Sequence, residues 1–486
     1  MTLFVVFYAF LLGLFLLVLD DSELLKLIPF LYLSIFFLVV LTIYKKKDRV
    51  LFCFFPSTIM SLYVTFFFFM GTLAFSLQYI QMDIADQWKF YEFDEFGLVS
   101  FYFFCAIAAT LLAQTLFVQI LSSKRLRLFN YKGHIFSQHS IGQGRTNPHR
   151  PNQKRYLIFS IIIAVFTIFY DIPLPGGVGS FSSVFFMFAI VHIAYFLKRN
   201  CYKYRVLIYI LNCGLLGVYF FEDRRLLAFY VFILCFIEFF DRRNLKIKLR
   251  NIVLFVSFSF LIVASIIAMS IQRGVGQFDT KSFIKSFMFV DDYLTSDWAV
   301  TMLFHNLEGP ATTFHSYNAV EHMVQTGDYK FGSTIIKFLF LPFPRSLIAG
   351  KPRSMVDEYT TVFYPSFREA GGSFVPNFYA EAFWNFGFVG GLFFITFIFF
   401  VLDNFYWFFI SKIRGRTRIE DVFFLASFSF LVFLFRGSGF DLFLLFSVIF
   451  FVMTYCYRSS DLLYCSKSRY LSLVAPPTEG QGRQSH

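Results

Sequence analysis

Charge is scarce in this chain, and its cysteines are not arranged for crosslinking or metal binding. Only 15% of the 486 residues are charged, whereas 57% are apolar and 78 are Phe. The seven cysteines show no Cys-x-x-Cys or Cys/His spacing, and none falls in a loop assigned below to the outer side. These absences exclude an external disulfide framework and give no sign of a metal site.

Long apolar runs dominate the rest of the sequence. A helix needs roughly 20 apolar residues to cross the hydrocarbon core of a bilayer, and the runs here have about that length. The sequence therefore predicts an all-α, polytopic integral membrane protein with about twelve transmembrane helices. The expected spans are 3–19, 25–44, 50–79, 97–123, 156–172, 183–197, 206–221, 226–240, 251–271, 380–410, 422–435 and 442–457.

The orientation follows from the distribution of Lys and Arg. With a cytoplasmic N-terminus, most of the 43 Lys and Arg residues fall in inner loops, such as 45–49 and 124–155, whereas the outward loop 80–96 holds five acidic residues against Lys89. The positive-inside rule favours this topology. The net charge of +12 is then explained by topology and by contact with anionic lipid, and nothing indicates nucleic acid.

One connection is much longer than the others. Residues 272–379 form a large external loop whose many aromatic residues argue against disorder. Its segment 334–348 is apolar but interrupted by Pro342 and Pro344, which predicts a short helix at the outer membrane surface. The expected divisions are transmembrane helices in 1–271, the loop 272–379, further transmembrane helices in 380–457 and a cytoplasmic tail 458–486.

Five arginines lie on the side that should be poor in cations: Arg224, Arg225, Arg273, Arg345 and Arg436. The planar guanidinium group suits bidentate binding of phosphate, so these residues are candidates for an anionic ligand at the outer surface. Each has a plainer explanation. Arg224 and Arg225 have Glu222 and Asp223 as neighbours, Arg436 has Asp441, Arg273 ends a helix, and Arg345 can meet lipid phosphates in general.

Acid and base candidates gather in the same external loop. His305, Glu308, His315, Glu321 and His322 occur within a short stretch, and Glu381 follows near the membrane. His and Glu are the side chains most readily tuned to take a proton from a hydroxyl group. No spacing singles one out, and a structural role is open for each. Loop aromatics, among them Tyr317 and Tyr359, are candidates for stacking on sugars or for interfacial anchoring.

A family resemblance follows from several of these features together. They are a basic inner face, the outward turn Arg224-Arg225-Leu226-Leu227, a large late external loop, Arg436-Gly437 near the end, and the loop exit 372–391 with its Pro, Tyr, Ala-Glu and Asn-Phe-Gly-x-x-Gly. The chain thereby resembles the Wzy-type O-antigen (oligosaccharide repeat unit) polymerases. The resemblance is topological over the whole chain and most specific at 372–391.

The resemblance implies a glycosyltransferase of the bacterial inner membrane that works at the periplasmic face. Such an enzyme transfers a growing glycan from undecaprenyl pyrophosphate to a second lipid-linked repeat unit, with a chain-length regulator protein as a partner and without a metal or other cofactor. The five arginines would bind pyrophosphate, and His305, Glu308, His315 or Glu381 would act as the base. An O-antigen ligase, which uses lipid A core as its acceptor, and a flippase for lipid-linked oligosaccharides are the alternatives.

Overall fold

A computed structural model describes the chain in segments. These are residues 2–19, 21–45, 55–80, 94–123, 309–340, 347–348, 350–369 and 371–413, together with the isolated positions 162, 165–166, 268, 285–286 and 288–289. Within them the secondary structure is helical, with no strand. The expected all-α fold is therefore confirmed for the described part of the chain.

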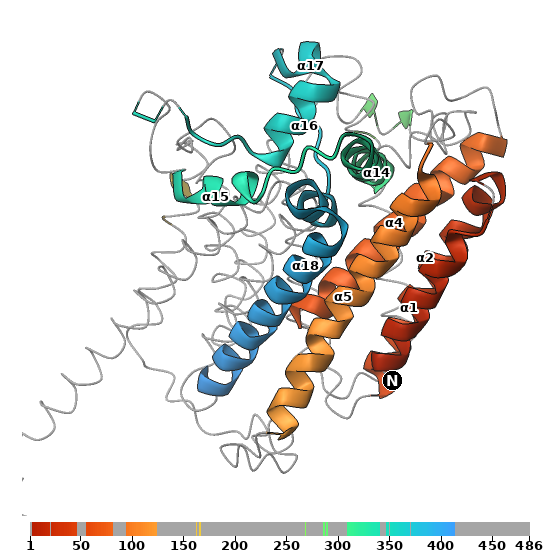
Figure 1. The fold of residues 1–486 in the computed structure, drawn as a ribbon, viewed down its shortest axis with the longest axis vertical. Coiled ribbons are helices and arrows are strands. Elements are labelled where there is room, and N and C mark those ends of the chain that lie inside the picture. Colours follow the sequence, from red (N-terminus) through yellow and green to blue (C-terminus); the bar gives the residue numbers. More distant parts are fainter. Residues whose placement is uncertain are drawn as a thin grey trace, which may run out of the picture.

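The first four helices are long apolar rods. They are α1 (Thr2–Leu16), α2 (Asp21–Lys45), α4 (Pro56–Ile80) and α5 (Phe96–Ser123). In each, large apolar side chains such as Leu, Val and Phe are distributed around the helix, as in helices surrounded by protein and lipid. These helices run along one another, with α1 packed on α5 and α2 on α4 (Figure 1). Helix α5 is the most deeply buried of them and lies at the centre of the bundle.

The fifth long helix, α18 (Phe378–Ile413), is the last described helix in the sequence, and it packs against α5. Of the five, α2, α4, α5 and α18 are long and apolar enough to cross a membrane, over Glu23–Ile43, Pro56–Ser76, Phe96–Gln119 and Phe378–Phe405. Helix α1 is shorter. The transmembrane character expected from the sequence is thus supported for these helices.

The spans expected at 3–19, 25–44, 50–79, 97–123 and 380–410 all correspond to helices with ends shifted by a few residues. The other seven expected spans lie outside the described residues apart from single positions, as do the loop 124–155 and the tail 458–486. The total of twelve spans, the membrane sidedness and the four-part division of the chain remain predictions.

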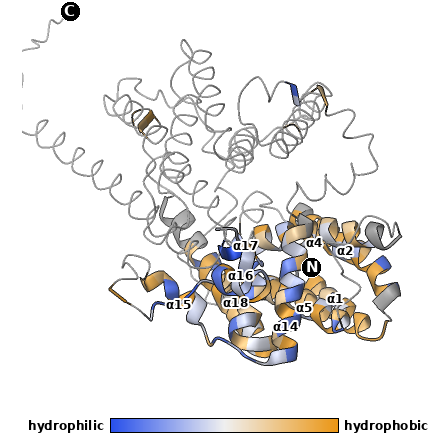
Figure 2. Cartoon of the chain, turned by 90° about the horizontal axis from the view of Figure 1, so that it is seen from above, coloured by the Kyte–Doolittle hydropathy of each residue, from blue (hydrophilic) through white to orange (hydrophobic). Residues whose placement is uncertain are grey.

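Four further helices cover one end of the bundle. They are α14 (Gly309–Thr326), α15 (Ser333–Phe340), α16 (Met355–Phe363) and α17 (Pro365–Glu369), called here the cap. The cap lies at the end of the bundle where α18 begins, whereas the N-terminus lies toward the opposite end (Figure 1). Helices α14 and α16 are more hydrophilic than α1, α2, α4 and α5, whereas α15 is about as apolar as α2 and α4 (Figure 2).

Helix α14 attaches the cap to the bundle. Tyr317 is fully buried, its hydroxyl is 2.9 Å from that of Tyr32 in α2, and Ser100 of α5 donates to it at 3.3 Å. Close approach to α4 depends on Gly71, since a Cβ atom there would lie 2.2 Å from Oγ1 of Thr313. The region expected as an external loop therefore contains a helix that packs among the apolar helices, and Tyr317 is not available for stacking on a sugar.

Candidate functional site

Helix α18 is interrupted close to the cap. Gly387 has φ 70° and ψ −166°, which ends the helical hydrogen bonding and leaves preceding carbonyl groups without helical partners. The carbonyls of Trp384 and Asn385 instead accept from the backbone N–H groups of Lys330 (3.1 Å) and Phe331 (2.8 Å). Figure 1 shows the first turns of α18 end-on and the remainder running along the bundle. The loop after α14 is thereby fixed to the break.

A buried polar network lies beside this interruption and contains Glu381, one of the expected bases. The side chain of Glu381 is almost completely buried, and its Oε1 accepts from Oγ1 of Thr334 at 2.9 Å. Asn385 donates from Nδ2 both to Thr334 Oγ1 and to the Glu381 carbonyl, at 2.8 Å each. The network joins α15 to α18 and fixes the position of the Glu381 carboxyl group.

His315, another expected base, belongs to α14, and its side chain packs against α16 inside the cap. It is 2% exposed, and its Nδ1 is 2.9 Å from the hydroxyl of Tyr359, which also accepts from Asn318 Nδ2 at 3.0 Å. The ring of Phe374 covers His315 at a centroid distance of 4.3 Å. His315 and Tyr359 thus connect two helices of the cap, and Tyr359, being fully buried, is not placed to stack on a sugar.

Glu321 joins the cap to α5. Its Oε1 accepts from the backbone N–H of Glu95 at 3.0 Å, immediately before the first residue of α5. A carboxylate at a helix N-terminus satisfies a donor that the helix itself cannot use. Burial raises the pKa of Glu321 to about 7, although the backbone hydrogen bonds from Glu95 and Asp94 oppose this shift. The attachment of α14 to α5 therefore contains a group that titrates near neutral pH.

The half-buried side chains of His322 and Glu358 and the buried side chain of Trp384 form a group called here the rim cluster. Trp384, at the start of α18, is 1% exposed and donates from Nε1 to Oε2 of Glu358 in α16 at 3.0 Å. The ring of His322 in α14 stacks on Trp384, with centroids 5.8 Å apart and an interplanar angle of 23°. Three separate helices therefore supply the cluster, and one buried indole fixes both titratable groups.

The pKa values in the rim cluster move toward one another. Burial raises the pKa of Glu358 above its ordinary value, although the Trp384 bond and the cations Lys330 and Arg353 oppose this. Burial and Lys330 lower the pKa of His322. A raised pKa brings the Glu358 carboxyl group closer to the range in which a base works near neutral pH, whereas a lowered pKa keeps the His322 imidazole neutral there.

Cationic groups lie close to this pair. Lys330 acts electrostatically on both Glu358 and His322, and Arg353 acts on Glu358. Lys330 also pairs with Asp328, while Arg353 is exposed. The rim cluster thus combines groups for proton transfer with positive charge that can attract an anionic ligand.

A second charged group stabilises the cap beneath its surface. Asp357 is buried between Lys337 of α15, whose Nζ lies 3.5 Å from Oδ2, and Arg368 of α17, which donates to Oδ1. The Ser354 hydroxyl accepts from the Asp357 N–H at 3.2 Å and so caps α16. These contacts join α15, α16 and α17 and support the helix that carries Glu358.

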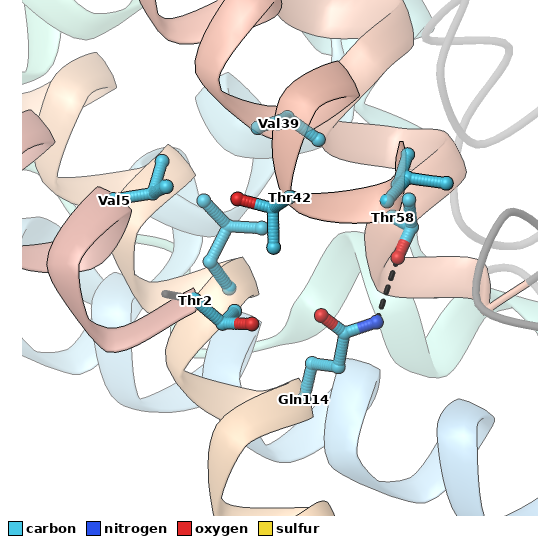
Figure 3. A pocket seen from close by; sticks show the side chains of 8 residues that line it. Thr2, Val5, Val39, Thr42, Thr58 and Gln114 are labelled. Carbon is cyan, nitrogen blue, oxygen red and sulfur yellow. Dashed lines mark hydrogen bonds between the residues drawn. The ribbon is translucent and has the colours of Figure 1, made fainter. Parts of the chain in front are cut away.

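A small cavity lies near the opposite end of the bundle (Figure 3). Its lining includes Thr2, Thr42, Thr58 and Gln114, and Gln114 donates from Nε2 to Thr58 Oγ1 at 2.7 Å. With a volume of about 10 Å³ it has room for about one water molecule. It is too small for a sugar or a phosphate group.

The remaining expected site residues fall outside the described part of the chain: Arg224, Arg225, Arg273, Arg345, Arg436, His305 and Glu308. Of the expected bases, the structure places His315 and Glu381 in separate buried networks. His322 is among the candidates expected from the sequence, whereas Glu358 and Trp384 are not. The available signal was the acidic pair Asp357-Glu358, which begins three residues after Ser354 in the first turn of an amphipathic helix.

Comparison with protein-family models, with curated proteins and with solved structures gave no match. The resemblance to repeat-unit polymerases therefore remains an expectation from the sequence.

Proposed function

We propose that this protein is a membrane-embedded glycosyltransferase that polymerises oligosaccharide repeat units carried on undecaprenyl pyrophosphate. The observation that carries the proposal is the rim cluster, in which Trp384 holds Glu358 and His322 beside cationic residues. The cap that bears this cluster is attached to helices long and apolar enough to cross a membrane. Support from the sequence comes from the outward arginines and from the resemblance at 372–391.

The proposed reaction divides into two tasks. Glu358 takes the proton from an acceptor sugar hydroxyl as the oxygen attacks the anomeric carbon of the donor glycan, and a new glycosidic bond forms. The bond from that carbon to pyrophosphate breaks, and undecaprenyl pyrophosphate leaves with the electron pair. Attack opposite the leaving group inverts the anomeric centre. Arginine and lysine side chains stabilise the charge that develops on the leaving pyrophosphate.

Glu358 is preferred to the other bases on geometric grounds. His315 and Glu381 are each about 2% exposed and are held by hydrogen bonds inside the protein. Glu358 is half-buried, which both raises its pKa and leaves it accessible to a substrate at the cap surface. His322 on the same indole is the second choice, since its lowered pKa keeps the imidazole neutral and able to accept a proton.

The test is the lipopolysaccharide banding pattern of source cells that lack the gene and carry wild-type protein, Glu358→Gln or Glu369→Gln at matched expression. Glu369 is exposed on α17 and supplies the matched control, because it undergoes the same chemical change on the same cap. We expect cells without the protein to carry lipid A core with a single repeat unit. Wild type and Glu369→Gln should restore the ladder, and Glu358→Gln should not.

Two other patterns would contradict the proposal. Core without any repeat unit in the deleted cells would indicate a ligase or a flippase, and an unchanged ladder would remove the protein from this process. A ladder restored by Glu358→Gln would reject Glu358 as the base while leaving polymerisation in place.

A further inference from the structure

Helix α15 has the reverse of the polarity expected for a helix on a water-soluble surface. Its polar side chains Thr334 and Lys337 point into the protein and are at most 4% exposed. Its apolar side chains Ile336 and Leu339 are 47% and 56% exposed. A helix in water buries its apolar face, so this arrangement indicates that the exposed face meets an apolar medium.

Phe331, just before α15, strengthens this indication. It is 81% exposed and has φ 47°, a conformation that costs energy for a residue with a bulky side chain. Its N–H bond to the Asn385 carbonyl fixes the backbone there. Packing within the described protein does not account for the exposed ring, whereas aromatic side chains are favoured at a membrane interface.

The position of α15 relates this apolar face to the membrane helices. A Cβ atom on Gly332 would lie 3.3 Å from the ring of Phe386, which in turn lies 4.9 Å from the ring of Phe394 in α18. Beyond Gly387, α18 carries a strongly exposed apolar stripe at four-residue spacing: Val389 (64%), Phe393 (74%) and Phe397 (61%). Both views show α15 on the side of α18 that faces away from α1 and α2 (Figures 1 and 2).

We infer that α15 is a membrane-surface anchor whose apolar face, with Phe331, inserts into the lipid leaflet beside α18 and continues the lipid-exposed surface of that helix. The polar face then has a defined role. Thr334 binds Glu381 and Lys337 pairs with Asp357, so lipid contact on one side of α15 holds the networks on its other side in register. This inference goes beyond the sequence expectation of a surface helix and does not depend on the proposed reaction.

Photo-crosslinking of the full chain in lipid nanodiscs tests the inference. The photoreactive residue p-benzoylphenylalanine replaces Ile336, Leu339 or, as control, Ser366, which is exposed on α17. These side chains are accessible, so the replacements leave the packed interior unchanged. The nanodiscs contain phosphatidylethanolamine and phosphatidylglycerol, and mass spectrometry identifies what each position has captured.

Phospholipid adducts at positions 336 and 339, several-fold above the level at 366, are the expected result. Adducts to a second copy of the chain at 336 and 339 would assign this face to a protein interface and overturn the inference. A lipid yield at those positions equal to that at 366 would place α15 in water and overturn it as well.

Discussion

Individual residues of the cap differ sharply in what their surroundings allow them to do. Glu358 and His322 share one buried indole and remain partly exposed, whereas His315 and Glu381 are enclosed in hydrogen-bonded networks. Burial moves the pKa values of Glu358 and His322 in opposite directions, because one group is charged when deprotonated and the other when protonated. The environment, more than the residue type, therefore distinguishes the candidates for proton transfer.

The sequence shows that His and Glu residues suited to proton transfer are present, but it does not show which of them lie together in the fold. His322 and Glu358 belong to separate helices of the cap, and the indole that joins them comes from α18. No spacing rule connects three such elements. The buried state of His315 and Tyr359 was equally hidden, because it depends on packing between α14 and α16.

Glu321 should make the stability of the cap depend on pH. Its pKa is about 7 in the folded protein against an ordinary value of 4.5, so the folded state holds the proton more tightly. The stability associated with the protonated form is complete below pH 4.5 and is lost as pH rises through about 7. We expect Glu321→Gln to abolish this part of the dependence, on the order of 1 kcal/mol once solvent screening is allowed for, since the amide oxygen can still accept from Glu95.

Thermal unfolding of the nanodisc-embedded protein at about pH 5.5 and about pH 8.5, on either side of the raised pKa, measures this effect. The wild type and the exposed control Glu369→Gln should both lose stability at the higher pH, and Glu321→Gln should lose less. Equal losses in all three proteins would show that Glu321 is not the titrating group.

The elements of the fold differ in how far local sequence determines them. Apolar runs predicted α1, α2, α4, α5 and α18 to within a few residues, because length and hydropathy alone decide whether a helix can cross a bilayer. Helix α14 was not predicted, since its mixed composition gives no strong periodic signal. The interruption of α18 depends on a distant loop that supplies Lys330 and Phe331 as donors, which apolarity does not reveal.

Substitution of Gly387 should damage the junction between α18 and the cap. Its φ of 70° disfavours any residue with a side chain, and a Cβ atom would lie 3.0 Å from the ring of Tyr329. We expect Gly387→Ala to destabilise the protein by roughly 1–3 kcal/mol. The temperature of half-unfolding in nanodiscs is the measurement.

Gly350→Ala is the matched control. A Cβ atom added to Gly350 would meet no heavy atom of the described residues within 4 Å, and the backbone there does not have a positive φ. Its replacement should therefore be close to neutral. Equal unfolding temperatures for the two variants would contradict the role given to Gly387.

In the described part of the molecule, apolar helices carry a more polar helical cap at one end. Tyr317 and Glu321 attach the cap to the bundle, and α15 turns its apolar face outward beside α18. In the proposed function this arrangement brings the rim cluster to the membrane surface, where the sugar of a lipid-linked substrate would lie. The outward arginines predicted from the sequence would complete the site by binding pyrophosphate.

The central claim is tested most directly by turnover with purified components. Lipid-linked repeat units extracted from source cells that lack the gene are incubated with the full-length protein in nanodiscs. Mass spectrometry then follows both the glycan length and undecaprenyl pyrophosphate. We predict carrier lipids bearing two or more repeat units, with one undecaprenyl pyrophosphate released for each bond formed. Unchanged single units and no released carrier, from protein that is folded and membrane-embedded, would contradict the claim.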